Sequence, residues 1–141
     1  GVDGVIIPDL PCEEAKEFIR YANKKGLVNI CFIAPTSSSE RVKKISSIAK
    51  GFIYYVSLTG VTGERKTISS DLKNKLLAIK RITNKPICVG FGICDAAQVR
   101  KVQSIADGVI IGSAIVKKIK ENITRGNLVR IVGNFVEKLN V

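Results

Sequence analysis

Three short glycine-containing segments have the composition of a phosphate-binding site. Residues 60–63 read Gly-Val-Thr-Gly, residues 90–92 read Gly-Phe-Gly, and Gly112 is followed by Ser113. Glycine allows the main chain to approach an anion closely, because no Cβ stands between the ligand and the backbone N–H groups. A helical pattern begins near Ser113, and a helix N-terminus favours a phosphate through its unpaired amides and its dipole. Each glycine alone is also explained by a tight turn, but together the three segments predict a phosphate site.

A long connection surrounds the first of these segments. It runs from Leu58 to Thr67 and exceeds the few residues that usually join a strand to a helix. Loops of this length are often lids or binding loops. Thr62 and Arg65 can donate hydrogen bonds to an anion, and two glycines allow the loop to bend. We therefore predict a lid over the phosphate site, with a merely solvated loop as the alternative.

Short β-branched runs alternate with amphipathic helical segments along the whole chain, which is typical of parallel strands joined by crossover helices. The expected strands are about Gly4 to Pro8, Val28 to Ala34, Phe52 to Ser57, Ile87 to Gly90 and Gly108 to Ile111. Helices are expected to start near Pro11, Ser38, Ser69 and Asp95, and at about Ala114 and Leu128. Gly26 and Gly51 follow cationic residues where helices should stop.

Five parallel strands fit two architectures, a complete doubly wound flavodoxin-like sheet or the last five strands of a (β/α)8 barrel. In a doubly wound sheet the phosphate site is expected after the first strand, but residues 8–11 read Pro-Asp-Leu-Pro and contain no glycine. The glycines instead follow the last three strands, where barrels bind phosphate. This favours the α/β class with a partial (β/α)8 TIM barrel, comprising parallel strands four to eight with their helices.

The chain length agrees with a partial barrel, because a whole one needs about 250 residues and this chain has 141. The sequence begins with Gly1 and enters a strand almost directly. We therefore expect residues 1–141 to be the C-terminal part of a single phosphate-binding TIM-barrel domain whose three N-terminal strands are absent.

Composition excludes several classes of protein. The formal net charge is +11, but Lys and Arg occur in pairs distributed over the helices rather than in one cluster, so a nucleic-acid partner is not expected. A run of 18 apolar residues is lacking, which argues against a membrane span. The four cysteines lie on separate elements without a C-x-x-C pair, and the chain has no His. We predict reduced thiols, no metal, and a cytoplasmic location, with a plastid stroma as the alternative.

Several longer segments carry a family resemblance. Residues 54–63, 89–93 and 107–116 closely resemble three successive signatures of the tryptophan synthase alpha subunit, and residues 8–11 and 34–36 match in order and spacing. The resemblance implies a carbon–carbon lyase of tryptophan biosynthesis, which cleaves indole-3-glycerol phosphate by a retro-aldol reaction. The products are indole and glyceraldehyde 3-phosphate. Indole then passes to a pyridoxal-phosphate-dependent beta subunit within an alpha2beta2 heterotetramer.

The resemblance also implies roles for individual residues. Those that hold the substrate phosphate are Gly63, Gly92, Gly112 and Ser113. Tyr54 and Phe91 line the substrate pocket, and Thr62 positions a catalytic aspartate when the lid closes. Asp9 and Pro35 lie near the face that meets the beta subunit.

The catalytic acid and base are the main departure from the family pattern. Retro-aldol cleavage needs two placed acid–base groups, and the family supplies them as a glutamate and an aspartate from the second strand and the loop after it. Both positions precede Gly1, and neither Asp9 nor Glu64 matches them. The resemblance therefore implies that this chain contains no catalytic acid or base, needs no cofactor, and is inactive alone.

Two other functions remain open at this point. A phosphosugar isomerase, an epimerase or a thiamin-phosphate-type synthase would share the last two glycine segments, but it is not expected to share the lid sequence. A non-catalytic half-barrel that binds phosphate is the second alternative.

Overall fold

A computed structural model of the chain describes residues 1–57, 70–90 and 92–140. The predicted lid, with Thr62, Gly63 and Glu64, and the predicted pocket residue Phe91 lie outside these residues.

Strands and helices alternate through the described residues. The strands are β1 (Gly4–Ile6), β2 (Val28–Ile33), β3 (Ile53–Val56), β4 (Ile87–Gly90) and β5 (Gly108–Ile110). The helices are α1 (Lys16–Lys24), α2 (Ser39–Ile48), α3 (Ser70–Lys80), α4 (Ala96–Gln103), α5 (Ser113–Glu121) and α6 (Leu128–Leu139).

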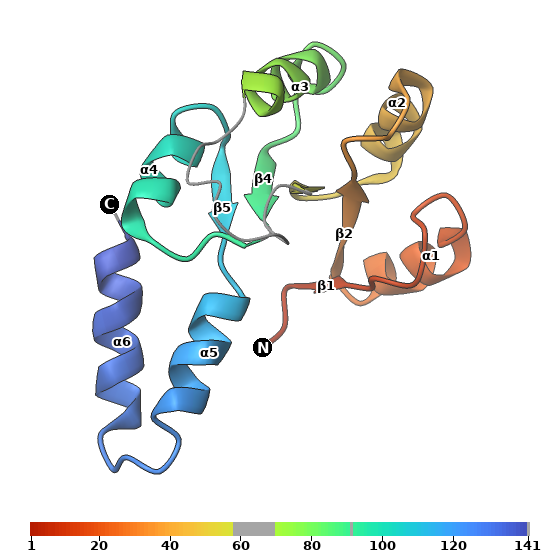
Figure 1. Cartoon of the computed structure of the whole chain (residues 1–141). Coiled ribbons are helices and arrows are strands. Elements are labelled where there is room, and N and C mark those ends of the chain that lie inside the picture. Colours follow the sequence, from red (N-terminus) through yellow and green to blue (C-terminus); the bar gives the residue numbers. More distant parts are fainter. Residues whose placement is uncertain (58–69, 91, 141) are drawn as a thin grey trace.

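The strands form one parallel sheet in the order β1-β2-β3-β4-β5, so each strand pairs with the next one along the chain. The sheet is curled, and α1 to α4 lie around its outer side (Figure 1). The two last helices pack against each other beyond β5. Sequential parallel order with helices on one side is the arrangement of a (β/α)8 barrel and not of a doubly wound sheet, which has helices on both sides. The predicted partial-barrel architecture is confirmed.

Buried and half-buried side chains alternate along the strands, so the sheet has an outer face that is buried and an inner face that is less buried. In β3, Ile53 and Tyr55 are almost fully buried, at 0% and 1% exposure, whereas Tyr54 and Val56 are half-buried. The buried set packs against the helices in one core that includes Ile45, and the register places residues of the same face side by side. The outer face of the sheet is therefore the core of this chain, and the inner face is only partly covered.

Local signals place several helix ends. Ser38 and Asp95 are the N-caps of α2 and α4, and their side-chain oxygens accept hydrogen bonds from the backbone N–H of Arg41 (3.2 Å) and Gln98 (2.8 Å). Gly26 and Gly51 adopt positive φ angles of 73° and 75°, which glycine tolerates without strain. These starts and stops are confirmed as predicted.

Two predicted boundaries are wrong. The segment at Pro11 forms isolated turns, in which Glu14 N donates to Pro11 O, and α1 begins only at Lys16. The first strand ends at Ile6 instead of Pro8. Proline has no N–H to donate to a sheet and fits the start of a turn as well as the start of a helix, so the sequence did not distinguish them.

The prediction of four reduced cysteines is also wrong. Cys12, in the segment before α1, and Cys31, on the outer face of β2, form a disulfide, while Cys88 and Cys94 are free. The two partners are 19 residues apart in the sequence. They meet because α1 returns the chain to the outer face of the sheet, which no local cysteine spacing reveals.

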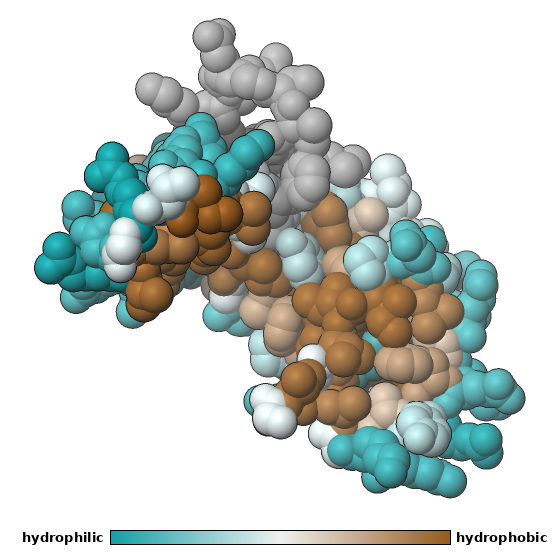
Figure 2. Space-filling model, turned by 90° about the horizontal axis from the view of Figure 1, so that it is seen from below, coloured by the Kyte–Doolittle hydropathy of each residue, from teal (hydrophilic) through white to brown (hydrophobic). Residues whose placement is uncertain are grey.

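The surface of the described chain keeps several large apolar side chains in solvent. Val129 is 87% exposed, Ile123 67%, Val2 66% and Val116 64%. Figure 2 shows two broad apolar areas on the face seen from below. Within the described residues, no helix is long and apolar enough to cross a membrane.

Candidate functional site

The carboxyl ends of β3, β4 and β5 lie at the same level. Val56 pairs with Gly90, and Gly90 pairs with Ile110. The backbone N–H of Ser57 donates a 3.0 Å hydrogen bond to the carbonyl of Gly90, which extends the ladder one residue beyond β3. Because the three strands end together, the segments that follow them leave the sheet at one edge. Ser57, Gly90 and Ile110, the last described residues before or at the start of the glycine-containing segments, therefore lie side by side.

Two of these segments have backbone conformations suited to an anion. Gly92 has a φ of 74°, in the left-handed region where glycine is favoured. Gly112 is the N-cap of α5, and Ser113 is its first residue. The first N–H groups of a helix have no intrahelical acceptor and point out of its N-terminus. A Cβ built at Gly112 would meet no atom of the described residues within 4 Å.

Aromatic side chains line the inner face of the sheet below this edge. The rings of Phe32 on β2 and Tyr54 on β3 lie 5.1 Å apart between centroids and are tilted by 45°. Tyr54 reaches over Gly90, where a Cβ would overlap its hydroxyl and come within 2.7 Å of its Cζ. A Cβ at Gly108 would likewise come within 2.7 Å of the sulfur of Cys88. Large residues beside glycines thus shape an apolar inner wall.

Phe32 was missed by the sequence prediction. Its signal was available, because it lies two residues from Ile30 in a strand whose alternate positions share one face. Its contact with Tyr54 depended on the register of β2 against β3, which pairs these two residues directly.

The inner wall is uncharged at neutral pH. Burial raises the pKa of Tyr54, so its phenol stays protonated. The pKa of Cys88 is raised, first by burial and then by the negative charge of Asp107, so this cysteine stays a thiol. The inward positions of the five strands carry no carboxylate. This wall can hold a planar apolar group but offers no acid–base pair.

The predicted site residues fall into two sets. Gly92, Gly112 and Ser113 follow the carboxyl ends of β4 and β5, whereas Tyr54 lies within β3. Asp9 and Pro35 follow β1 and β2 at the same edge, and Asp9 is exposed. Thr62, Gly63 and Phe91 belong to segments outside the described residues. Among the residues that are described, no three His, Cys, Asp or Glu side chains are grouped so that they could hold a metal ion.

Comparison with known proteins points to one family. Residues 1–137 match the family model of the tryptophan synthase alpha chain. The chain is 42% identical to the tryptophan synthase alpha chain of Thermoanaerobacter sp. (strain X514) over 139 residues, which cover 99% of this chain and 53% of that protein. It is also 42% identical to that of Methanocaldococcus jannaschii over 130 residues, or 92% and 46% of the two chains.

Solved structures agree with the sequence relatives. The tryptophan synthase a2b2 complex from Pyrococcus furiosus contains a chain that matches with a TM-score of 0.85 and 38% identity, covering 99% of this chain and 56% of that one. The tryptophan synthase alpha chain from Legionella pneumophila matches with a TM-score of 0.84 and 36% identity, covering 99% and 51%. This chain therefore spans about half the length of the relatives that it matches.

Proposed function

Because this chain belongs to the tryptophan synthase alpha chain family, we propose that it is part of a lyase that cleaves indole-3-glycerol phosphate to indole and glyceraldehyde 3-phosphate in tryptophan biosynthesis. In this proposal the chain is the C-terminal part of a single barrel domain. It supplies the phosphate site and the lid loop.

The observation that supports this proposal is the shared edge formed by the ends of β3, β4 and β5. Gly90 and Ile110 pair at this edge, and the positive-φ residue Gly92 and the N-cap of α5 at Gly112 each follow two residues later in the sequence. Backbone N–H groups from a glycine turn and from a helix end are donors that recognise phosphate without a charged side chain. Barrel enzymes bind phosphate at the turns after their last two strands.

The inner face of the sheet can bind the indole half of the substrate. A phosphate held at Ser113 orients the rest of the molecule along the inner face, where Tyr54 and Phe32 offer flat apolar surface to an indole ring. Phe91 completes the pocket, and Gly63 adds a phosphate donor. Fixing both ends of the substrate holds the bond to be broken in one orientation, which lowers the entropic part of the barrier.

The acid and base belong to residues outside this chain. Carbon–carbon cleavage requires a proton for the indole carbon and removal of the glycerol hydroxyl proton, and the wall described above has no group that titrates for this purpose. We assign these roles to a glutamate and an aspartate in the preceding strands of the barrel. Thr62 positions that aspartate from the lid.

We further propose a beta subunit as the partner, in an alpha2beta2 assembly in the cytoplasm. A structurally similar relative from Pyrococcus furiosus forms such an a2b2 complex. The exposed Asp9 and the nearby Pro35 would face the beta subunit, because both follow strands at the edge where the site opens.

Turnover by the full-length protein that contains this chain tests the proposed reaction. The protein is incubated with indole-3-glycerol phosphate, and both indole and glyceraldehyde 3-phosphate are quantified. Equal amounts of the two products are expected, with faster release when a beta subunit is added. An absence of indole, together with conversion of a phosphosugar by the same preparation, would assign the barrel to an isomerase or epimerase instead.

A further inference from the structure

The segment between β1 and α1 leaves the sheet at the edge where the candidate site opens. It covers residues 7–15 and has no helix or strand of its own. Its turns are closed by short-range hydrogen bonds, from Leu10 N to Ile7 O (3.4 Å) and from Ala15 N to Cys12 O (3.3 Å). Turns of this kind fix the local path of the chain but do not attach it to the sheet. Its attachment must come from side chains.

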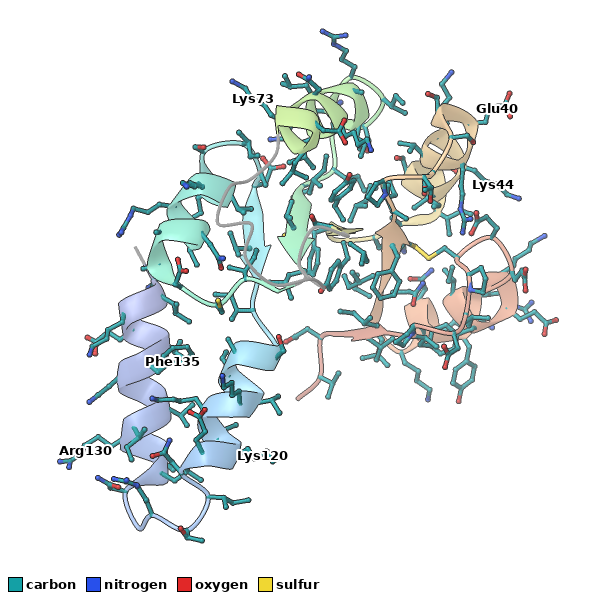
Figure 3. All side chains as sticks on the ribbon, in the orientation of Figure 1. Glu40, Lys44, Lys73, Lys120, Arg130 and Phe135 are labelled. Carbon is teal, nitrogen blue, oxygen red and sulfur yellow. A yellow bond between two sulfur atoms is a disulfide. The ribbon has the colours of Figure 1, made fainter. Side chains whose placement is uncertain are left out.

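Side chains from the middle of the segment supply that attachment. The disulfide from Cys12 reaches Cys31 on β2, and it is visible as the yellow bond between β2 and the segment before α1 in Figure 3. The amide of Asn29, also on β2, points at both sulfurs, at 3.4 Å from Cys12 and 3.8 Å from Cys31. Next to them, Glu13 forms a 2.8 Å ion pair with Arg41 of α2. The disulfide is the covalent member of this group.

We propose that the Cys12–Cys31 disulfide is a redox-sensitive latch, which holds residues 7–15 against β2 when oxidised and releases them when a dithiol reduces it. The ion pair between Glu13 and Arg41 is not a substitute for the bond, because it is not covalent and its Arg41 side chain is 51% exposed, although the Glu13 side chain is only 17% exposed. Residues 7–15 follow β1 at the edge of the sheet that carries the candidate site. The redox state of the disulfide therefore determines whether this segment is held in a fixed position at that edge.

The chemistry is an ordinary thiol–disulfide exchange. One thiolate of the dithiol attacks Cys12 Sγ, the sulfur–sulfur bond breaks, and Cys31 leaves as a thiolate next to the Asn29 amide donor. The second thiolate of the reductant then attacks the mixed disulfide and displaces Cys12. The dithiol loses two electrons and two protons and becomes a cyclic disulfide, while both cysteines gain a proton and become thiols.

Burial determines how this exchange starts. Cys31 has no exposed surface and Cys12 is 7% exposed, so Cys12 is the sulfur that an attacking thiolate reaches first. Even this attack requires the segment to open briefly. Reduction should therefore be slow in the folded protein and much faster in denaturant.

The test uses the full-length protein with dithiothreitol as the reductant. Thiols are alkylated in denaturant and located by mass spectrometry, and amide hydrogen exchange is measured for peptides that cover residues 7–15 and residues 87–90. Without reductant we expect alkylation of Cys88 and Cys94 but not of Cys12 and Cys31. After reduction all four should react, and exchange in residues 7–15 should become at least tenfold faster while residues 87–90 stay unchanged.

Two variants separate the latch from a general effect of reduction. The double variant Cys12→Ser/Cys31→Ser should show the fast exchange without dithiothreitol, and Cys94→Ser, at an exposed free cysteine, should respond like the parent. Alkylation of all four cysteines before reduction would overturn the proposal, and so would unchanged exchange after it. Faster exchange in residues 87–90 as well would also overturn it, because the bond would then stabilise the whole fold rather than one segment.

Discussion

At the scale of single residues, Gly112 is the position where a side chain should affect phosphate binding more than folding. A Cβ there meets no neighbour among the described residues, so Gly112→Val should fold, and we expect its added methyl groups to enter the space in front of α5. We expect KM for indole-3-glycerol phosphate to rise by about tenfold or more, which corresponds to about 1.4 kcal/mol. Steady-state kinetics and thermal denaturation of the full-length protein measure both effects.

Gly126 provides the matched control for this substitution. It lies in the turn between α5 and α6, and its Cβ would also meet no atom within 4 Å. Gly126→Val should leave KM unchanged. An equal rise in KM for both variants would show that α5 has shifted as a whole, and an unchanged KM for Gly112→Val would remove Gly112 from the phosphate site.

Gly90 and Tyr54 should be coupled, because the tyrosine ring occupies the place of a side chain at Gly90. Gly90→Ala should cost about 1 to 3 kcal/mol of unfolding free energy, the usual range for overpacking. Tyr54→Leu removes the hydroxyl and Cζ that cause the overlap. The double variant should therefore be more stable than the sum of the two single effects, as measured by urea denaturation in a double-mutant cycle. Simple additivity would mean that the ring moves aside without cost.

At the scale of elements, Asp107 lies directly before β5 and connects the end of α3 to the start of β4. Its carboxylate accepts hydrogen bonds from the backbone N–H of Ile87 and from the Lys80 ammonium, both at 2.9 Å. The backbone N–H of Asp107 donates to the carbonyl of Ile87 at 3.0 Å, so the start of β4 is held to the segment before β5. The Ile87 N–H, followed by Lys80, lowers the pKa of this carboxyl below its usual value.

This lowered pKa sets a pH dependence of stability. Because the folded pKa lies below the unfolded value of about 3.9, the stabilisation is fully present above that pH and is lost as the pH falls through the folded pKa. Asp107→Asn should cost about 1 kcal/mol at neutral pH, a small value because the Asp107 side chain is 40% exposed. The difference from the parent should shrink below about pH 4 in urea denaturation. Glu121→Gln, which removes an exposed carboxylate from an i,i+4 pair, is the control variant for the loss of a surface charge.

At the scale of the whole molecule, the described chain leaves apolar surface and sheet edges without cover. Each of β1 and β5 pairs with one neighbour in the described sheet, and Val2, Val116 and Val129 are strongly exposed. Unpaired strand edges and apolar patches promote association between chains. Residues 1–141 expressed alone should therefore self-associate, as measured by size-exclusion chromatography with light scattering. A monomer that unfolds in one cooperative step would contradict this expectation.

The same chain should lack lyase activity when it is isolated. The proposed acid and base lie outside it, and each such group contributes about 10²- to 10⁴-fold to a rate. Assays with indole-3-glycerol phosphate should give no indole above background. Adding the preceding part of the barrel in trans should restore turnover together with a defined size. Measurable turnover by residues 1–141 alone would show that the catalytic groups have been misplaced.

The sequence by itself determined the parallel alternation of strands and helices, the caps at Ser38 and Asp95 and the stops at Gly26 and Gly51. These features depend on interactions within about four residues and on hydrophobic periodicity, both of which can be read from neighbouring positions. The order of the strands also followed, because short crossovers place consecutive parallel strands next to each other. Gly90 and Gly112 were located correctly at the ends of β4 and β5 for the same reason.

Only the tertiary structure decided which distant side chains meet. Cys12 with Cys31, Phe32 with Tyr54, and Asp107 with Lys80 are pairs whose contact depends on strand register and on the return path of the helices. The residues before the late start of α1 carry two of these distant contacts, the disulfide of Cys12 and the ion pair of Glu13. A slip of one residue in the register would turn every alternate side chain to the other face, so these contacts exist only in the folded sheet.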